Sequence, residues 1–204
     1  MAYSDFALSE IKEQFQTTIE EEVNIFADVQ AVKITNFLAE TLKENIPLAL
    51  AIHTEKARSE MIVAPVLIEL RKMLEHRISL FSGVEFNIDK EKGLNGICDY
   101  IISLSKEQLY VTSPVICVVE ANHDNIKSGL AQCIAEMIAS KLFNERERNN
   151  LQTLYGVVTT GSIWRFLKLE ERVYIDTEEY HIRQIEKIIG ILLHIINSEK
   201  NQTV

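Results

Sequence analysis

Positive charge is scarce in this sequence. Its 204 residues include 21 Lys and Arg against 30 Asp and Glu, which gives a formal net charge of −9 at pH 7. Such a balance argues against a broad basic face for non-specific binding to nucleic acid. The two locally basic stretches, Arg71 with Lys72 and residues 141–148, are typical of solvated helix faces.

Long hydrophobic runs are also missing. The longest apolar run covers residues 188–196, and it is shorter than the roughly 20 residues that span a bilayer. No positively charged segment followed by an apolar one opens the chain, so we expect no signal peptide. These absences predict a cytoplasmic protein without a membrane segment.

Cysteine, histidine and glycine do not form the patterns of familiar catalytic sites. The three cysteines, Cys98, Cys117 and Cys133, lie in apolar runs without paired metal-ligand spacing, so we expect reduced core residues. The five histidines have no HExxH spacing and no cysteine partner, which disfavours a zinc site. The seven glycines form no phosphate-binding loop, and no nucleophile elbow is present.

What the chain does contain is enough apolar sequence for one folded domain. Hydrophobic residues make up 47% of it, which is sufficient for a full core. We predict an α/β fold with a mixed sheet of about five or six strands flanked by helices. Residues 1–53 are predicted to form a helical N-terminal extension packed on a core of residues 54–204.

The element boundaries follow from hydrophobic period and capping residues. Helices are expected before Pro47, over residues 54–76 with Thr54 as cap and an interruption at Pro65, and over 125–143 after a cap at Asp124. A last helix, apolar on nearly every side, should start at a cap at Asp176 or Thr177. Strands are expected at 79–89, 96–104, 115–121, 153–160, 163–169 and 172–175.

Two acids interrupt strands that are otherwise rich in isoleucine and valine. Asp99 lies three residues after Gly96 in one predicted strand. Glu120 lies near the end of the next, directly before Ala121 and Asn122. Because an unpaired buried acid is costly, both carboxylates should reach solvent, a partner or a metal ion. Carboxylate oxygens suit Mg²⁺ or Mn²⁺, so Asp99 and Glu120 are the predicted metal ligands.

The order of these elements resembles the PD-(D/E)xK nuclease superfamily over about residues 54–169. The resemblance implies a restriction endonuclease-like fold and phosphodiester hydrolysis of DNA by metal-activated water. Residue by residue, Glu60 matches the acid of the first core helix, Asp99 the motif aspartate and Glu120 the acid of the final triplet. Gln132 and Glu136 are similar to the polar helix positions that many members turn toward the site.

One position departs from the family pattern. Asn122 stands where the family has a lysine, whose charge acts on the attacking water and the transition state. Loss of one such electrostatic group typically costs about 100- to 1000-fold in rate. Lys127 or Lys141 could replace it, or both could be ordinary surface lysines.

Three other hypotheses stay open. Asp99 and Glu120 could serve structural hydrogen bonds, with Arg165 or Ser59 as partners. The chain could be an inactive nuclease-fold descendant that acts as a binding or assembly subunit, which the missing lysine and the acidic balance favour. It could also be a partner-binding module that forms a homodimer through the apolar C-terminal helix.

Overall fold

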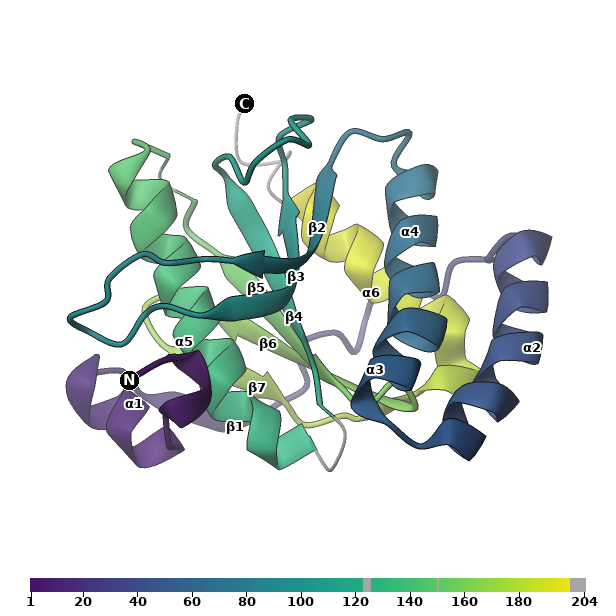
Figure 1. Ribbon diagram of the computed structural model, residues 1–204, viewed down its shortest axis with the longest axis horizontal. Helices are drawn as coiled ribbons and strands as arrows, with labels where there is room; N and C mark the ends of the chain where they lie inside the picture. The colour runs from purple at the N-terminus through teal and green to yellow at the C-terminus, as the bar shows by residue number, and fades with distance from the viewer. Residues whose placement is uncertain (123–125, 150, 199–204) are drawn as a thin grey trace.

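A single mixed sheet runs through the protein, with helices on both faces (Figure 1). The computed structural model describes residues 1–122, 126–149 and 151–198. The sheet has eight strands in the order β1-β7-β6-β5-β4-β3-β2, with β8 paired to β6. The predicted α/β class is therefore confirmed, with more strands than expected. The strands are β1 (Ile19–Val23), β2 (Ser79–Glu85), β3 (Ile97–Ser103), β4 (Val115–Ala121), β5 (Leu154–Thr159), β6 (Ile163–Leu169), β7 (Val173–Asp176) and β8 (Tyr180–His181).

The helices form two groups, one on each face of the sheet (Figure 1). On one face, α5 packs through residues such as Ile134 against Val118 of the sheet. On the other face, Leu67 of α4 and Leu192 of α6 pack against Val119. The helices are α1 (Leu8–Gln14), α2 (Asn36–Ile52), α3 (Glu55–Arg58), α4 (Ala64–Met73), α5 (Ile126–Arg146) and α6 (Ile185–Ser198), with short 3-10 turns at Tyr3–Asp5 and Ile182–Gln184.

The connection from β4 through α5 to β5 brings two strand ends together. Strand β4 is antiparallel to β3 and parallel to β5. Since parallel strands point the same way, the carboxyl ends of β4 and β5 lie at the same end of the sheet. There the Asn122 backbone N–H donates to Thr159 O at 2.8 Å. Glu120 lies one residue before the end of β4, at this end of the sheet.

The sequence had suggested that the N-terminal segment is helical throughout, but it is not. Strand β1 pairs in parallel with β7, with Ile19 opposite Val173. Its three central residues are glutamates, which favoured a helix. At the edge of the sheet, however, side chains such as those of Glu21 and Glu22 remain exposed, so the strand buries no charge. The extension therefore contributes a strand to the sheet as well as helices.

Helix α2 continues through Pro47 to Ile52, although the prediction ended it near the proline. Leu42 and Ala49, on either side of Pro47, are both buried against the core. Tertiary packing thus outweighs the lost backbone hydrogen bond. The prediction for the next helix is confirmed: the Thr54 side chain accepts from Ala57 N at 3.2 Å. After a π-helical turn, Ser59–Val63, α4 begins at Ala64, one residue before Pro65.

The start of the last helix was predicted wrongly. Asp176 ends β7 and is fully buried, where its carboxylate accepts from Glu178 N and from the Tyr180 hydroxyl, each at 3.2 Å. Strand β8 and a 3-10 turn follow, so α6 begins only at Ile185. The apolar residues of α6 pack into the core of this same chain.

Several smaller predictions also have an outcome. Cys98, Cys117 and Cys133 are buried and free, as expected. The predicted cap Asp124 lies outside the described residues. Within the part of the chain that the structure describes, no helix combines the length and apolar character needed to cross a bilayer.

The outer strands of the sheet have different surroundings. Beside β2, the Gln108 side chain accepts from Leu80 N at 3.3 Å and donates to Leu80 O at 2.8 Å. Beside β1, the glutamates of the strand face solvent, and Glu20 pairs with Arg172 of the neighbouring loop at 3.0 Å. Polar side chains therefore line the outer edge of both outermost strands.

Candidate functional site

Asp99 lies where β3 changes orientation. Cys98 packs in the layer under α5, whereas Tyr100 packs in the opposite layer, so the strand turns over between them. The register places Asp99 opposite Gly83 of β2, whose positive φ of 63° bends the hairpin. At this bend the Asp99 carboxylate is half-buried and accepts from Ala121 N at 2.8 Å.

Glu120 projects from β4 toward α5. Its side chain is 6% exposed, and Oε2 accepts from the Gln132 amide at 2.8 Å. The hydrogen bond from Ala121 N places the Asp99 carboxylate beside the peptide that follows Glu120. The two strand acids therefore converge at one end of the sheet.

Gln132 links Glu120 to a further acid on α5. The same Nε2 donates to Oε1 of Glu136 at 3.2 Å. Glu136 is fully buried, and no described residue forms a hydrogen bond with its Oε2. Gln132 thus holds two carboxylates from different elements around one amide nitrogen.

The acids share an environment that disfavours negative charge. Burial, together with the charges of Glu136 and Asp99, raises the pKa of Glu120 well above its ordinary value. Burial also raises the pKa of Glu136, although hydrogen bonds from Gln132 and Cys98 oppose the rise. Burial raises the pKa of Asp99, partly offset by the bond from Ala121. None of the ion pairs between described residues includes Asp99, Glu120 or Glu136.

The helix acid that acts on this cluster is Glu55 rather than Glu60. Glu60 is exposed, and its carboxylate lies 3.6 Å from the Lys56 ammonium. The charge of Glu55 raises the pKa of both Asp99 and Glu120. Sequence reasoning missed Glu55, which occupies the first turn after the helix cap. Its place in the first turn of the helix was the only feature of the sequence that could have identified Glu55.

Asn122 ties the end of β4 to the first turn of α5. Its Oδ1 accepts from the Ser128 hydroxyl at 3.1 Å, and its backbone N–H is bonded to β5. Of the two lysines that could replace the family's lysine, Lys127 is exposed in that same helical turn. Lys141 lies about 13 Å further along the helix axis than Gln132, which is too far for a contact with Glu120.

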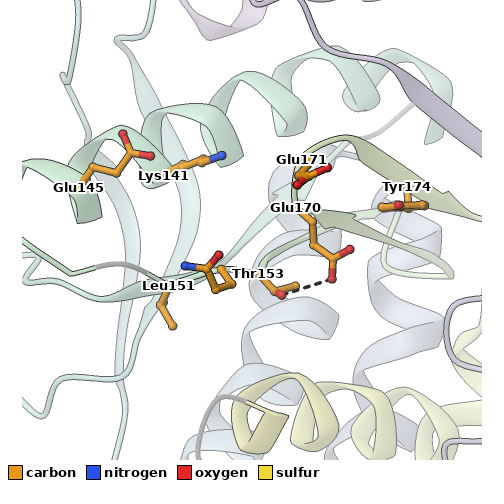
Figure 2. A pocket seen from close by; sticks show the side chains of 8 residues that line it. Lys141, Glu145, Leu151, Thr153, Glu170, Glu171 and Tyr174 are labelled. Atoms are coloured by element: carbon orange, nitrogen blue, oxygen red, sulfur yellow. Dashed lines mark hydrogen bonds between the residues drawn. The ribbon is translucent and has the colours of Figure 1, made fainter. Parts of the chain in front are cut away.

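Lys141 lines a separate pocket at the other end of α5. The pocket holds about 670 Å³, and Figure 2 shows Lys141 and Glu145 from α5 across from Glu170 and Tyr174. A hydrogen bond of 3.4 Å joins the Thr153 hydroxyl to Glu170. Lys141 therefore belongs to a polar hollow remote from the acids.

Arg165 and Ser59 were the possible hydrogen-bond partners of Asp99 and Glu120, but both have other partners in the structure. Arg165 donates to the Asp176 carbonyl at 3.0 Å and lies 3.6 Å from Glu179. The Ser59 hydroxyl lies 2.7 Å from the hydroxyl of Tyr100. No hydrogen bond of either residue to Asp99 or Glu120 is found among the described residues.

The donor set fits a hard divalent cation bound by few protein groups. Asp99, Glu120 and Glu136 offer carboxylate oxygens without a compensating cation, and Oε2 of Glu136 has no described hydrogen-bond partner. In the described part of the chain, no three His, Cys, Asp or Glu side chains are grouped so that they could hold one metal ion. Mg²⁺ commonly uses one or two carboxylates and retains its waters, so a pair of these acids suffices.

Comparison with known proteins adds no family name to this geometry. No protein-family profile matches the sequence, and no curated protein matches it. What the structure itself provides is an order of elements around the acids. A helix precedes three antiparallel strands, and α5 then leads to β5, parallel to the third of them.

Proposed function

We propose that this chain is a restriction endonuclease-like protein that hydrolyses phosphodiester bonds in DNA with Mg²⁺ or Mn²⁺. The observation that carries the proposal is the convergence of Asp99 and Glu120 from adjacent strands, through the 2.8 Å bond from Ala121 N to Asp99. The order of helix and strands around them is similar to that of the PD-(D/E)xK superfamily. The carboxyl oxygens of the cluster, which take part in none of the ion pairs between described residues, would give a divalent cation a place to bind.

Each residue of the site has a distinct role in this proposal. Asp99 and Glu120 would hold the cation, which would supply a water of lowered pKa and polarisation of the phosphate. Glu55 adds a third carboxylate from the rim. Gln132 fixes the orientation of Glu120 through its 2.8 Å hydrogen bond. These residues position a phosphodiester at the end of the sheet where β4 and β5 terminate.

The weak point of the site is Asn122. An amide supplies a hydrogen-bonding group but no fixed charge, so the expected activity is about 100- to 1000-fold below that of a lysine-containing site. The Ser128 hydroxyl bonded to Oδ1 also ties this side chain to α5. The activity we propose is therefore slow.

The second candidate is a catalytically inactive descendant of a nuclease that acts as a binding or assembly subunit. Asn122 and the net charge of −9 favour it. A homodimer through α6 has less support, because the apolar side chains of that helix are buried within the chain. A cytosolic location completes the proposal and agrees with three free, buried cysteines.

A melting experiment with Mn²⁺ separates the two candidates. At 100 times its dissociation constant, a ligand stabilises the folded state by about 2.7 kcal/mol. We expect the melting temperature of the wild type to rise with Mn²⁺, and that of Asp99→Asn to stay constant. Glu60→Gln, which alters an exposed acid, is the control and should behave like the wild type. No rise in the wild type would favour the inactive subunit.

Cleavage is the second measurement. The wild type is incubated with double-stranded and single-stranded DNA in Mg²⁺ or Mn²⁺, and Glu120→Gln should abolish any cleavage that is seen. Equal rates in the wild type and in Glu120→Gln would place the active site elsewhere.

A further inference from the structure

Large apolar side chains are exposed on the outermost helix of the fold. Figure 1 shows α2 at the outer edge of the molecule, with α3 and α4 on its inner side. Four side chains of α2 and α4 are each 45–67% exposed: Phe37, Leu48, Ile52 and Ile68. Single exposed apolar residues are ordinary on a protein surface, but a continuous group of them marks an interaction site.

These side chains form one continuous surface. On a helix with 3.6 residues per turn, Phe37, Leu48 and Ile52 project within about 60° of one another. The Lys72 ammonium lies 5.6 Å from the centre of the Phe37 ring, and Ile68 precedes Lys72 by one turn of α4. The apolar surface therefore extends from α2 onto α4. Together with the half-buried Thr41, the four residues form what we call the α2 face.

The spacing of the α2 face along its helix is the same in both directions. Phe37, Thr41, Leu48 and Ile52 follow one another at intervals of four, seven and four residues. A second α2 helix that runs antiparallel therefore meets the first in register. Phe37 lies opposite Ile52 of the second copy, and Thr41 lies opposite Leu48, as a two-fold axis requires. The α2 face is thus complementary to itself.

The two ends of the α2 face are also complementary in charge. A helix C-terminus carries partial negative charge, which a nearby cation stabilises. The last turn of α2, residues 49–52, contains no basic residue. In the antiparallel arrangement, Lys72 beside Phe37 comes to the Ile52 end of the second α2 helix. Each copy thus supplies a cation to the helix end of the other.

We propose that a second copy of this chain docks on the α2 face, so that the protein forms a two-fold symmetric dimer through antiparallel α2 helices. The axis passes the helices between Glu44 and Asn45, midway between Phe37 and Ile52. The contact is only a few helical turns long, so the dimer is weak and depends on protein concentration. The inference goes beyond the proposed function and shares no residue with the proposed metal site, so each can fail without the other.

Sedimentation velocity from micromolar to submillimolar concentrations tests the dimer. The wild type should change with concentration from a monomer of 23.3 kDa to a dimer of twice that mass. Leu48→Glu places a charge inside the contact and should remain a monomer at every concentration. The matched control is Leu50→Glu, because Leu50 is also exposed but projects from the opposite side of α2. This control should dimerise like the wild type.

Three sedimentation results would overturn the inference. The first is a wild type that stays monomeric at every concentration. The second is a dimer that persists in Leu48→Glu, because the contact would then lie on another surface. The third is an equal loss of the dimer in Leu48→Glu and Leu50→Glu, because the α2 face would then have no special part in it.

Position 44 tests the symmetry axis without any change to the apolar residues. The two Glu44 carboxylates lie close to each other beside the axis and repel, so Glu44→Gln should increase the dimer fraction. Glu44→Cys should form an intermolecular disulfide on oxidation, since the native cysteines are buried and do not compete. Lys43→Cys, whose side chain points away from the α2 face, is the control and should not. Equal cross-linking of both cysteine variants would overturn the antiparallel arrangement.

Discussion

At the scale of single residues, Asn122 leaves the acids of the candidate site without the positive charge that a lysine would supply. Asp99, Glu120 and Glu136 place three carboxyl groups at one end of the sheet, and burial raises the pKa of all three. Asn122 adds no positive charge to balance them. The nuclease site that we propose would therefore depend on an external cation more strongly than a lysine-containing site would.

The first prediction concerns Asn122→Lys. A lysine ammonium at this position would add a fixed charge to the proposed active site, so metal-dependent DNA cleavage should rise about 100-fold or more. Initial rates on a plasmid substrate measure it, with Asn122→Ala as the matched control that removes the amide without adding charge. Equal rates for Asn122→Lys and Asn122→Ala would show that the lysine position of this chain lies elsewhere.

The second prediction concerns the pH dependence of stability in a metal chelator. Glu120 and Glu136 ionise near 4.5 when unfolded but at higher pH when folded. The folded state thus holds more protons above pH 4.5, and the free energy of unfolding should fall with rising pH by about 1.4 kcal/mol per unit for each proton retained. Denaturant unfolding between pH 5 and about 8 measures this slope.

Glu136→Gln provides the comparison for that slope. Glutamine does not titrate, and its neutral amide also lowers the pKa of Glu120 toward the ordinary value. The decline with pH should therefore become shallower in the variant than in the wild type. A slope as steep as that of the wild type would mean that other groups cause the pH dependence.

At the scale of elements, the close packing of α5 on the sheet sets the position of Glu120. A Cβ at Gly129 would lie 2.7 Å from a methyl group of Val158 and 3.4 Å from Cγ of Glu120. Glycine thus lets the helix approach the ends of β4 and β5. Gln132, one turn later, reaches Glu120 because of this approach.

The third prediction follows from that contact. Gly129→Ala should lower the free energy of unfolding by about 1–3 kcal/mol through overpacking, even though alanine favours a helix. It should also weaken Mn²⁺ binding, because Glu120 must move. Denaturant unfolding and calorimetry measure the two effects. The control, Glu145→Ala on the exposed face of α5, should change stability by less than about 0.5 kcal/mol.

How much the sequence could predict also differs between elements. The strands that carry Asp99 and Glu120 were predictable because isoleucine and valine runs mark them clearly. Strand β1 was not, since its three glutamates are typical of a helix and only its pairing with β7 makes it a strand. The start of α6 was missed because Asp176 resembles a helix cap but forms its bonds within the turn after β7.

The same contrast holds for the site. An acid inside a strand rich in isoleucine is conspicuous, so Asp99 and Glu120 could be proposed from sequence. Glutamates on helices are common, and only packing reveals that Glu136 is fully buried while Glu60 is exposed. Glu55 likewise became visible only through its electrostatic effect on the two strand acids.

At the scale of the whole molecule, the N-terminal segment completes the core around the site. Tyr3 is 1% exposed and packs against the same layer as Cys98. Its hydroxyl donates to Phe86 O, far away in sequence. The segment thus closes the layer that buries Glu136, so residues 1–53 and the core are expected to unfold together.

The fourth prediction tests this closure with Tyr3→Phe. Loss of the hydroxyl leaves the Phe86 carbonyl without its donor, so the free energy of unfolding should fall by about 1–3 kcal/mol. Tyr110→Phe, at a tyrosine that is 65% exposed, is the control and should be neutral. Denaturant unfolding followed by Trp164 fluorescence measures both variants. No difference between them would mean that the N-terminal turn is only loosely attached.

The two outermost strands affect whether copies of the protein associate with one another in a crowded solution. An open strand edge is a template on which a neighbouring molecule can add its own strand. Gln108 already occupies both the N–H and the carbonyl of Leu80 on β2, and the glutamates of β1 repel an identical edge. Copies of this chain should therefore resist joining sheet to sheet, which protects a protein with an extensive strand core from forming fibres.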